Sequence, residues 1–165
     1  MNINKNIKTN FLSKGTVVSL AVIFFVFILD RITKIVIINH QLDSKSIFVN
    51  NYLNFELVWN TGISFGLLSQ NAGLYYHLIS LLIFSVIIFL IYLVVKSTFV
   101  EKILFSLILG GAIGNLCDRL IYFAVPDFID FHIKDLHWFT FNIADIFISM
   151  GIILIIIRDL MTKKI

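Results

Sequence analysis

Four long apolar stretches constrain what this chain can fold into, at about 16–38, 74–95, 103–123 and 138–157. Each is close to the roughly 20 residues that a helix needs to cross the hydrocarbon core of a bilayer. Apolar residues make up 59% of the 165 residues and charged residues 14%, so too little polar surface remains to cover a water-soluble domain. The sequence therefore predicts an all-α polytopic membrane protein with four transmembrane helices. Soluble enzymes, nucleic-acid-binding proteins and disordered regulators are excluded.

The first apolar stretch has one alternative interpretation, a secretory signal peptide, because lysines precede it. Its apolar part is long, however, and no small-residue cleavage site follows Ile38. We therefore expect an uncleaved helix. The length suits one domain, and we expect residues 1–165 to form a single membrane-embedded unit.

Basic residues are unequally divided between the two ends of the predicted spans. The N-terminal segment, the connection at 96–102 and the C-terminal tail hold eight Lys and Arg residues against two acidic ones, and the remaining segments hold five against eight. Cytoplasmic segments of membrane proteins carry the excess of Lys and Arg. Both termini are therefore predicted to be cytoplasmic, with outer loops at about 39–73 and 124–137.

The longer outer loop has a strand-like pattern. Phe55, Leu57 and Trp59 alternate with other side chains, and the preceding residues are rich in β-branched and aromatic types. This period of two predicts short, half-buried strands closed by a turn at Thr61-Gly62. We expect a small strand-containing region on the outer side.

Polar residues gather at one predicted depth. Ionisable groups inside a membrane are costly and usually mark a functional site. Asp30, Asp118 and Arg119 lie late in helices that run outward, Asp145 lies early in a helix that runs inward, and Asp127 lies just beyond the third span. Asn115 shares a helix face with Asp118 and Arg119, and Asn142 lies one turn before Asp145. These residues predict one polar site near the outer face.

Several polar features also have structural interpretations. Asp30 and Lys34 have the spacing and order of an intrahelical ion pair. Arg119 is predicted to be the counter-charge of Asp118 beside it. Gly110 and Gly114 have the small-xxx-small spacing that allows close helix packing. Cys117 is interpreted as an apolar filler.

The shorter outer loop raises the question of a metal site. It contains two histidines and three acidic residues: Asp127, Asp130, His132, Asp135 and His137. Their spacings match no zinc pattern. The preferred interpretation is a solvated outer loop, and no metal is predicted.

Two carboxyl groups held close together cannot both ionise cheaply, so they share a proton and can activate water. Spacing allows Asp118, Asp127 and Asp145 as members of such a pair. If Asp118 is the partner of Arg119, Asp127 and Asp145 remain. Such hydrolysis needs no cofactor. A small ion-coupled transporter and a non-catalytic assembly subunit are the alternatives, although a transporter would need polar groups near the membrane midplane.

Five motifs, in the same order over about 120 residues, resemble those of the lipoprotein signal peptidases, signal peptidase II. Residues 30–34 resemble the D-x-x-T-K segment of that family, and residues 60–66 its N-x-G-x-x-F motif. Residues 110–119 resemble G-G-A-x-G-N-x-x-D-R. Asp127-Phe128 and residues 141–145 resemble the last two, V-x-D-F and F-N-x-A-D. Pro126 departs from the family, which usually has an aliphatic residue before the aspartate.

The resemblance implies an aspartic endopeptidase that removes signal peptides from diacylglyceryl-modified bacterial prolipoproteins, cutting before the lipid-modified cysteine. It implies Asp127 and Asp145 as the catalytic pair. It implies supporting roles for a set of polar residues and one glycine: Asp30, Lys34, Asn60, Gly62, Asn115, Asp118, Arg119 and Asn142. Membrane lipids and globomycin-type inhibitors are expected ligands. The segment from Asp127 to His132 resembles Gram-negative members, which favours an inner membrane.

Overall fold

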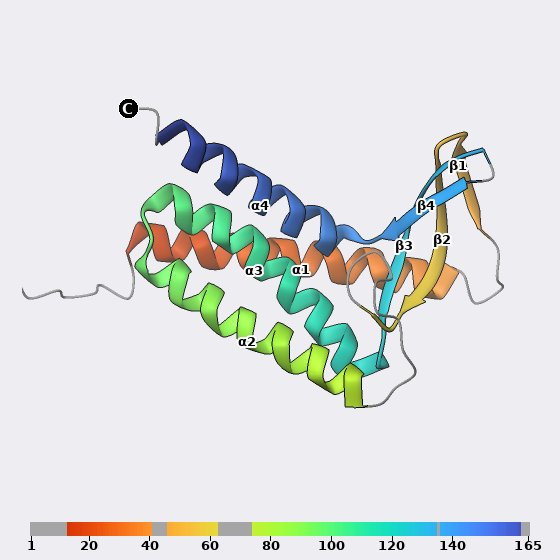
Figure 1. Ribbon diagram of the computed structural model, residues 1–165, viewed down its shortest axis with the longest axis horizontal. Coiled ribbons are helices and arrows are strands. Elements are labelled where there is room, and N and C mark those ends of the chain that lie inside the picture. Colours follow the sequence, from red (N-terminus) through yellow and green to blue (C-terminus); the bar gives the residue numbers. More distant parts are fainter. Residues whose placement is uncertain (1–12, 41–45, 63–73, 135, 163–165) are drawn as a thin grey trace, which may run out of the picture.

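The computed structural model describes residues 13–40, 46–62, 74–134 and 136–162. Four helices form a bundle, with a four-stranded sheet at one end of it (Figure 1). The helices are α1 (Lys14–His40), α2 (Leu74–Lys96), α3 (Phe99–Tyr122) and α4 (Ile143–Thr162). The strands are β1 (Ile47–Asn50), β2 (Leu53–Asn60), β3 (Val125–Ile133) and β4 (Leu136–Phe141).

The sheet is antiparallel, in the order β1-β2-β3-β4. The strands predicted before residue 60 are confirmed as the β1–β2 hairpin, which turns at residues 51–52. Beyond β2 the Gly62 backbone N–H donates to the Asn60 side-chain oxygen at 2.9 Å, which ends the strand in a tight turn. The chain from residue 63 to 73, including Phe65 of the predicted motif, lies outside the described residues.

The structure corrects two predicted bounds: the outer loop predicted at about 124–137 belongs to a β-hairpin, and the helix predicted from about 138 begins at Ile143. β3 and β4 fill this segment, so the last apolar stretch is a strand until Phe141 and becomes a helix only at Ile143. Hydropathy cannot separate the two because Leu136 to Phe141 is as apolar and aromatic as the helix after it. The break is at Asn142, a residue type that commonly begins helices. The fold is mostly helical with a small sheet.

Helix α3 lies at the centre of the bundle and packs against α1, α2 and α4. Its glycines permit this close approach, as the small-residue spacing predicts. A Cβ at Gly110 would lie 2.8 Å from the Val26 Cβ on α1, and one at Gly111 would lie 2.6 Å from the Ala144 carbonyl oxygen on α4. These contacts bring the polar residues of three helices together.

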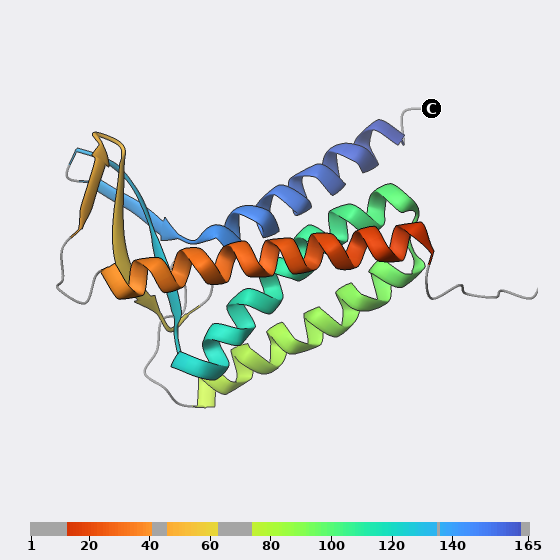
Figure 2. The same cartoon turned by 180° about the vertical axis from the view of Figure 1, so that it is seen from behind.

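Two of the described helices, Tyr76–Lys96 and Phe99–Tyr122, are long and apolar enough to cross a membrane. Large apolar side chains are exposed all along the bundle, for example Phe24 of α1, Phe89 of α2 and Leu160 of α4. Helix α1 begins and α4 ends at the end away from the sheet, where the α2–α3 connection also lies (Figures 1 and 2). The prediction that both termini are cytoplasmic requires α1 to begin and α4 to end at the same end of the molecule, as they do. Four spans and their orientation stay predictions.

Candidate active site

Asp127 of β3 and Asp145 in the first turn of α4 line one pocket of about 270 Å³. The pocket lies between α2, α3 and α4 and the sheet. Asn60, Asn115 and Arg119 also line it. Both residues are almost wholly buried within the protein, with 2% of Asp127 and 4% of Asp145 exposed. The structure thus brings together the two aspartates that the sequence singles out.

Two asparagine amides hold Asp127. The Asn60 Nδ2 donates to one carboxylate oxygen at 2.8 Å, and the Asn142 Nδ2 donates to the other at 2.6 Å. Asn60 ends β2, and Asn142 precedes α4, so the carboxylate is oriented from both sides of the site. With both oxygens bound to neutral amide donors, its position is fixed, and Asp127 forms no ion pair with another of the described residues.

The pKa of Asp127 is raised from 3.8 to about 7. Burial is the largest cause, since it disfavours the charged form, and the nearby charge of Asp145 adds to it. The hydrogen bonds from Asn60 and Asn142 act in the opposite direction. Near neutral pH the carboxyl group therefore exchanges a proton readily, as a general acid or base must.

Asp145 is held by the start of its own helix. The Asn142 side-chain oxygen accepts from the Asp145 backbone N–H at 3.0 Å, and the Asp145 carboxylate accepts from the Asn142 backbone N–H at 3.3 Å. This reciprocal arrangement is a capping box. The Asn115 Nδ2 donates to the other Asp145 oxygen at 2.9 Å. The F-N-x-A-D segment thus both begins α4 and orients a carboxylate.

A buried ion cluster supports the site from α1 and α3. The Lys34 ammonium donates to Asp30 at 2.8 Å, to Asp118 at 2.6 Å and to the Asn115 side-chain oxygen at 2.9 Å, which uses all three of its protons. The predicted Asp30–Lys34 ion pair is confirmed. Asp30 also accepts from the backbone N–H of Ala144 in the first turn of α4, at 3.0 Å. Lys34 is therefore linked to Asp145 through one amide, Asn115.

The predicted Asp118–Arg119 pair is wrong. Asp118 accepts from Lys34 and from Arg31, and no role was predicted for Arg31. Neighbouring helix residues diverge by about 100°, so adjacent side chains face different partners. Asp118 is still not a member of the pocket pair, because two cations of α1 bind it.

Arg119 points instead toward the chain after β2. One of its guanidinium nitrogens donates to the Gly62 carbonyl oxygen, and the group lies 5.6 Å from the centre of the Tyr76 ring. The Tyr76 hydroxyl donates to the Arg119 backbone carbonyl at 2.7 Å. Within the described part of the chain, Nε and the other terminal nitrogen of Arg119 are buried without hydrogen-bond partners. Tyr76 is a further site residue that the sequence did not indicate, since tyrosine near a helix start is ordinary.

The rest of the pocket is apolar. Leu82, Ile83 and Val86 of α2 face Ile148 and Ile152 of α4 across it. A second apolar pocket of about 410 Å³ lies on the other side of Asp145, between β4 and α4. Asp145 lines both. Asp145 thus lies where the two apolar pockets meet, and Asp127 lines only the first.

The histidines of the shorter loop are not in this site. His132, His137 and Asp130 form a separate group on β3 and β4, and Asp130 and His132 are buried, so the prediction of a solvated loop is wrong for them. Asp135 lies outside the described residues.

Comparison with known proteins gives a consistent result. The family described as "Signal peptidase (SPase) II" matches residues 22–161. The lipoprotein signal peptidase of Pelagibacter ubique is 43% identical over 149 residues, covering 89% of this chain and 90% of that protein. That of Thermodesulfovibrio yellowstonii is 39% identical over 138 residues, covering 84% and 91%.

Solved structures with similar folds are membrane enzymes. One bacterial membrane enzyme, determined by the in meso method at 2.3 Å resolution, superposes with a TM-score of 0.75 at 32% identity, covering 88% of this chain and 89% of that chain. A second, at 1.9 Å, gives 0.70 at 32% identity, covering 86% and 91%. The sequence motifs, the fold and these matches lead to one conclusion: this chain is an integral membrane protein that belongs to the signal peptidase II family.

Proposed function

We propose that this chain is an aspartic endopeptidase that removes the signal peptide from diacylglyceryl-modified prolipoproteins, cutting before the lipid-modified cysteine. Asp127 and Asp145 are the proposed catalytic residues. The observation that carries this is the burial of both residues on one largely apolar pocket, with the pKa of Asp127 raised to about 7. Two interacting carboxyl groups of this kind can hydrolyse a peptide bond without a metal or other cofactor.

The two carboxyl groups are proposed to divide the proton transfers. Ionised Asp145 takes a proton from water as the water oxygen attacks the scissile carbonyl carbon, and protonated Asp127 gives its proton to the carbonyl oxygen. Asp145 then passes its proton to the leaving nitrogen as the C–N bond breaks, and Asp127 recovers a proton from the hydroxyl of the collapsing intermediate. Both groups return to their starting states. The neutral amide donors around Asp127 favour this assignment, because they orient the carboxyl group without adding a positive charge beside it.

The supporting residues are proposed to hold this geometry. Lys34 orients the Asn115 amide, which in turn orients Asp145. Asp30 ties α1 to the start of α4. Arg119 holds Gly62, and its remaining N–H groups are available for a backbone carbonyl of the substrate.

The proposed substrate matches the surroundings of the pair. A signal peptide is an apolar helix and the lipid-modified cysteine carries acyl chains, so apolar groups lie on both sides of the scissile bond. The two apolar pockets that share Asp145 provide such surfaces. Membrane lipids and globomycin-type inhibitors are proposed to use the same pockets. We propose no nucleic-acid partner.

The proposed topology has four spans, both termini cytoplasmic and the pair near the outer face of a bacterial inner membrane, in one domain over residues 1–165. The start of α1, the end of α4 and the α2–α3 connection lie at the same end of the molecule, which supports this topology (Figure 1). A reporter fused after Ile165 should be active only in the cytoplasm. Activity restricted to the outside would reverse the proposed orientation.

The function is tested by processing a labelled prolipoprotein with the purified full-length chain in detergent. We expect one cleavage, just before the lipid-modified cysteine, that globomycin blocks and that persists in EDTA. An ion-coupled transporter or an assembly subunit would not cleave this substrate. Cleavage that is lost in EDTA and restored by a divalent ion would contradict the metal-free mechanism.

A further inference from the structure

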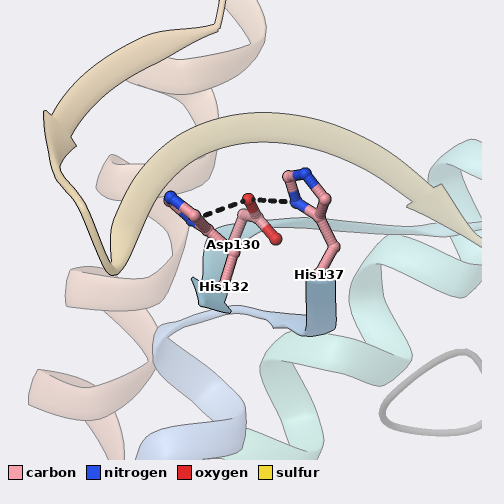
Figure 3. A group of neighbouring side chains, drawn as sticks. All are labelled: Asp130, His132 and His137. Carbon is pink, nitrogen blue, oxygen red and sulfur yellow. Dashed lines mark hydrogen bonds and ion pairs between the residues drawn. The ribbon is translucent and has the colours of Figure 1, made fainter. Parts of the chain in front are cut away.

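Three potential metal-binding side chains converge on the β3–β4 hairpin. Asp130 and His132 lie two residues apart on β3, and His137 lies on β4, directly across from His132 (Figure 3). One ligand atom from each lies within 4.8 Å of the others. The sequence spacing concealed this group, because strand pairing brings the third residue to it.

A bulge in the sheet places His137 in this position. Phe131 pairs with Phe139, but the next residue, His132, pairs with His137, so Trp138 is the extra residue on β4. The Trp138 ring stacks on Phe131 with centroids 6.5 Å apart, and the His137 ring stacks on His132 at 5.3 Å. Bulges of this kind redirect side chains and are common at functional positions.

Asp130 lies between the two imidazoles. Its Oδ2 is 2.8 Å from the His137 Nδ1 and 3.4 Å from the His132 Nδ1. Ligand atoms about 2.0–2.1 Å from a tetrahedral zinc ion are about 3.3 Å apart. One of these separations already fits, and the other needs to widen by about half an ångström, which the exposed His137 side chain allows.

His132 provides the second, independent observation. The residue is 6% exposed, and its Nδ1 has no hydrogen-bond partner among the described residues, although the Asp130 Oδ2 lies 3.4 Å away. Buried polar atoms are nearly always hydrogen-bonded, and an unpartnered one requires an explanation. An ion between His132, Asp130 and His137 would satisfy this nitrogen.

The group is separate from the proposed catalytic pair. Side chains alternate between the two faces of a strand, so Asp130 and His132 share one face of β3 and Asp127 belongs to the other. The contacts agree, since Asp127 binds Asn60 and Asn142 and Asp130 contacts the two histidines. A ligand here would act on the sheet and not on the bond being cleaved.

We propose that Asp130, His132 and His137 form a binding site for a first-row divalent transition metal ion, with Zn²⁺ as the best match. A carboxylate and two imidazoles are a ligand set that Zn²⁺ accepts, and the exposure of His137 leaves a fourth position for water. The ion would replace the Asp130–His137 hydrogen bond and join β3 to β4. Its role is to stabilise the sheet beside the active site.

The test is Zn²⁺ binding by the full-length chain in detergent, purified with a histidine-free tag, in competition with a chromophoric chelator. We expect one equivalent per chain and a higher thermal midpoint when Zn²⁺ is bound. His132→Ala and His137→Ala should each weaken binding by at least about tenfold, since even the loss of an outer-shell partner costs this much. His77→Ala is the matched control, because His77 is exposed on α2 and lies outside the group.

His137→Ala keeps the test interpretable if His132→Ala fails to fold, because the His137 side chain is 56% exposed. The proposal is overturned if the unsubstituted chain binds no zinc at one equivalent, or if the His137→Ala and His77→Ala variants bind it equally well. Cleavage of prolipoprotein is measured in parallel. It should not depend on zinc, so failure of this proposal leaves the peptidase assignment unaffected.

Discussion

The side-chain amide of Asn142 donates to Asp127 at 2.6 Å while the same residue begins the helix that carries Asp145. One asparagine therefore fixes the distance between a strand and a helix at the point where the two proposed catalytic carboxylates meet. A change at Asn142 affects the orientation of Asp127 and the start of α4 together. Replacements of Asn142 that keep one of these two roles and remove the other therefore separate the effect on stability from the effect on catalysis.

The first prediction concerns the catalytic pair. Asp127→Asn and Asp145→Asn preserve shape while removing the titrating carboxyl group, and each should reduce turnover by at least roughly 10²–10⁴-fold, the usual effect of losing a general acid or base. The double variant should be little worse than either single one, because both act in one step. Turnover per folded molecule, with globomycin binding as the measure of folding, checks this.

Asp118→Asn should have a different effect. It leaves Arg31 and Lys34 with one carboxylate fewer inside the protein, and breaking a buried pair typically costs about 3–5 kcal/mol. We expect a lower thermal midpoint and a lower yield, together with reduced activity. If a stably folded Asp118→Asn chain is inactive while Asp127→Asn cleaves at the normal rate, the pair is Asp118 and Asp145 instead.

Asn142→Ser separates capping from catalysis. Serine caps helices about as well as asparagine, so α4 should keep its stability, but serine lacks the amide that binds Asp127. Asn142→Ala loses both interactions and should also lose about 1 kcal/mol of stability. Comparing kcat with the thermal midpoint in the two variants checks this. Normal turnover in Asn142→Ser would show that the amide contact is dispensable.

The pH dependence follows from the raised pKa of Asp127. Because this group must hold a proton to act as the acid, activity should fall as the pH rises through about 7. The Asn142 hydrogen bond lowers this pKa, so Asn142→Ser should move the alkaline limb to higher pH. A kcat/KM profile between pH 5 and 9, at fixed detergent and salt, is the measurement, because kcat/KM reports the groups of the substrate-free enzyme. An alkaline limb that does not move would mean that another group controls it.

The raised pKa of Asp127 also makes the stability of the folded chain depend on pH. The folded-state pKa of Asp127 is above the unfolded value, so its carboxyl group is more easily ionised in the unfolded chain. Asp127 therefore contributes favourably to the free energy of unfolding below its unfolded pKa of 3.8. This contribution is lost as the pH rises through the folded pKa of about 7. Asp127→Asn should therefore reduce the fall in stability across this window.

Sequence patterns predicted the membrane character, the β1–β2 strands and the gathering of polar residues from several helices. All ten proposed site residues lie in or beside the same buried network, as the motifs and the helical spacing implied. Helix spacing could not predict which side chains on other helices these residues would bind. Asp118 turned out to bind α1 and not its neighbour Arg119, because partner choice depends on how α1 and α3 cross.

The β3–β4 hairpin was missed for a different reason. Strand β4 runs into the last apolar stretch without a polar interruption, so only the capping residue Asn142 marked the boundary between strand and helix. The pairing of His132 with His137 depends on a bulge, and a pattern of single residues does not encode where a bulge falls. The histidines were therefore interpreted from their spacing alone.

The last prediction tests the packing that assembles the site. An alanine in place of a helical glycine normally stabilises a helix by about 1 kcal/mol. At Gly114 the effect should be reversed, because a Cβ there would lie 2.6 Å from an Asp30 carboxylate oxygen. That oxygen accepts from Lys34, and the other Asp30 oxygen accepts from Ala144 at the start of α4.

We therefore expect Gly114→Ala to destabilise the chain by about 1–3 kcal/mol, the usual cost of overpacking. It should also lower turnover, since displacing Asp30 disturbs the links through Lys34 and Ala144 to the segment that holds Asp145. Cys117→Ala is the matched control on the same helix, because no hydrogen bond or ion pair is described for this side chain, and it should leave stability and turnover nearly unchanged. Thermal midpoints and turnover of both variants decide the matter. If Gly114→Ala is as stable and as active as the unsubstituted chain, close contact between α1 and α3 is not what holds the catalytic carboxylates in place.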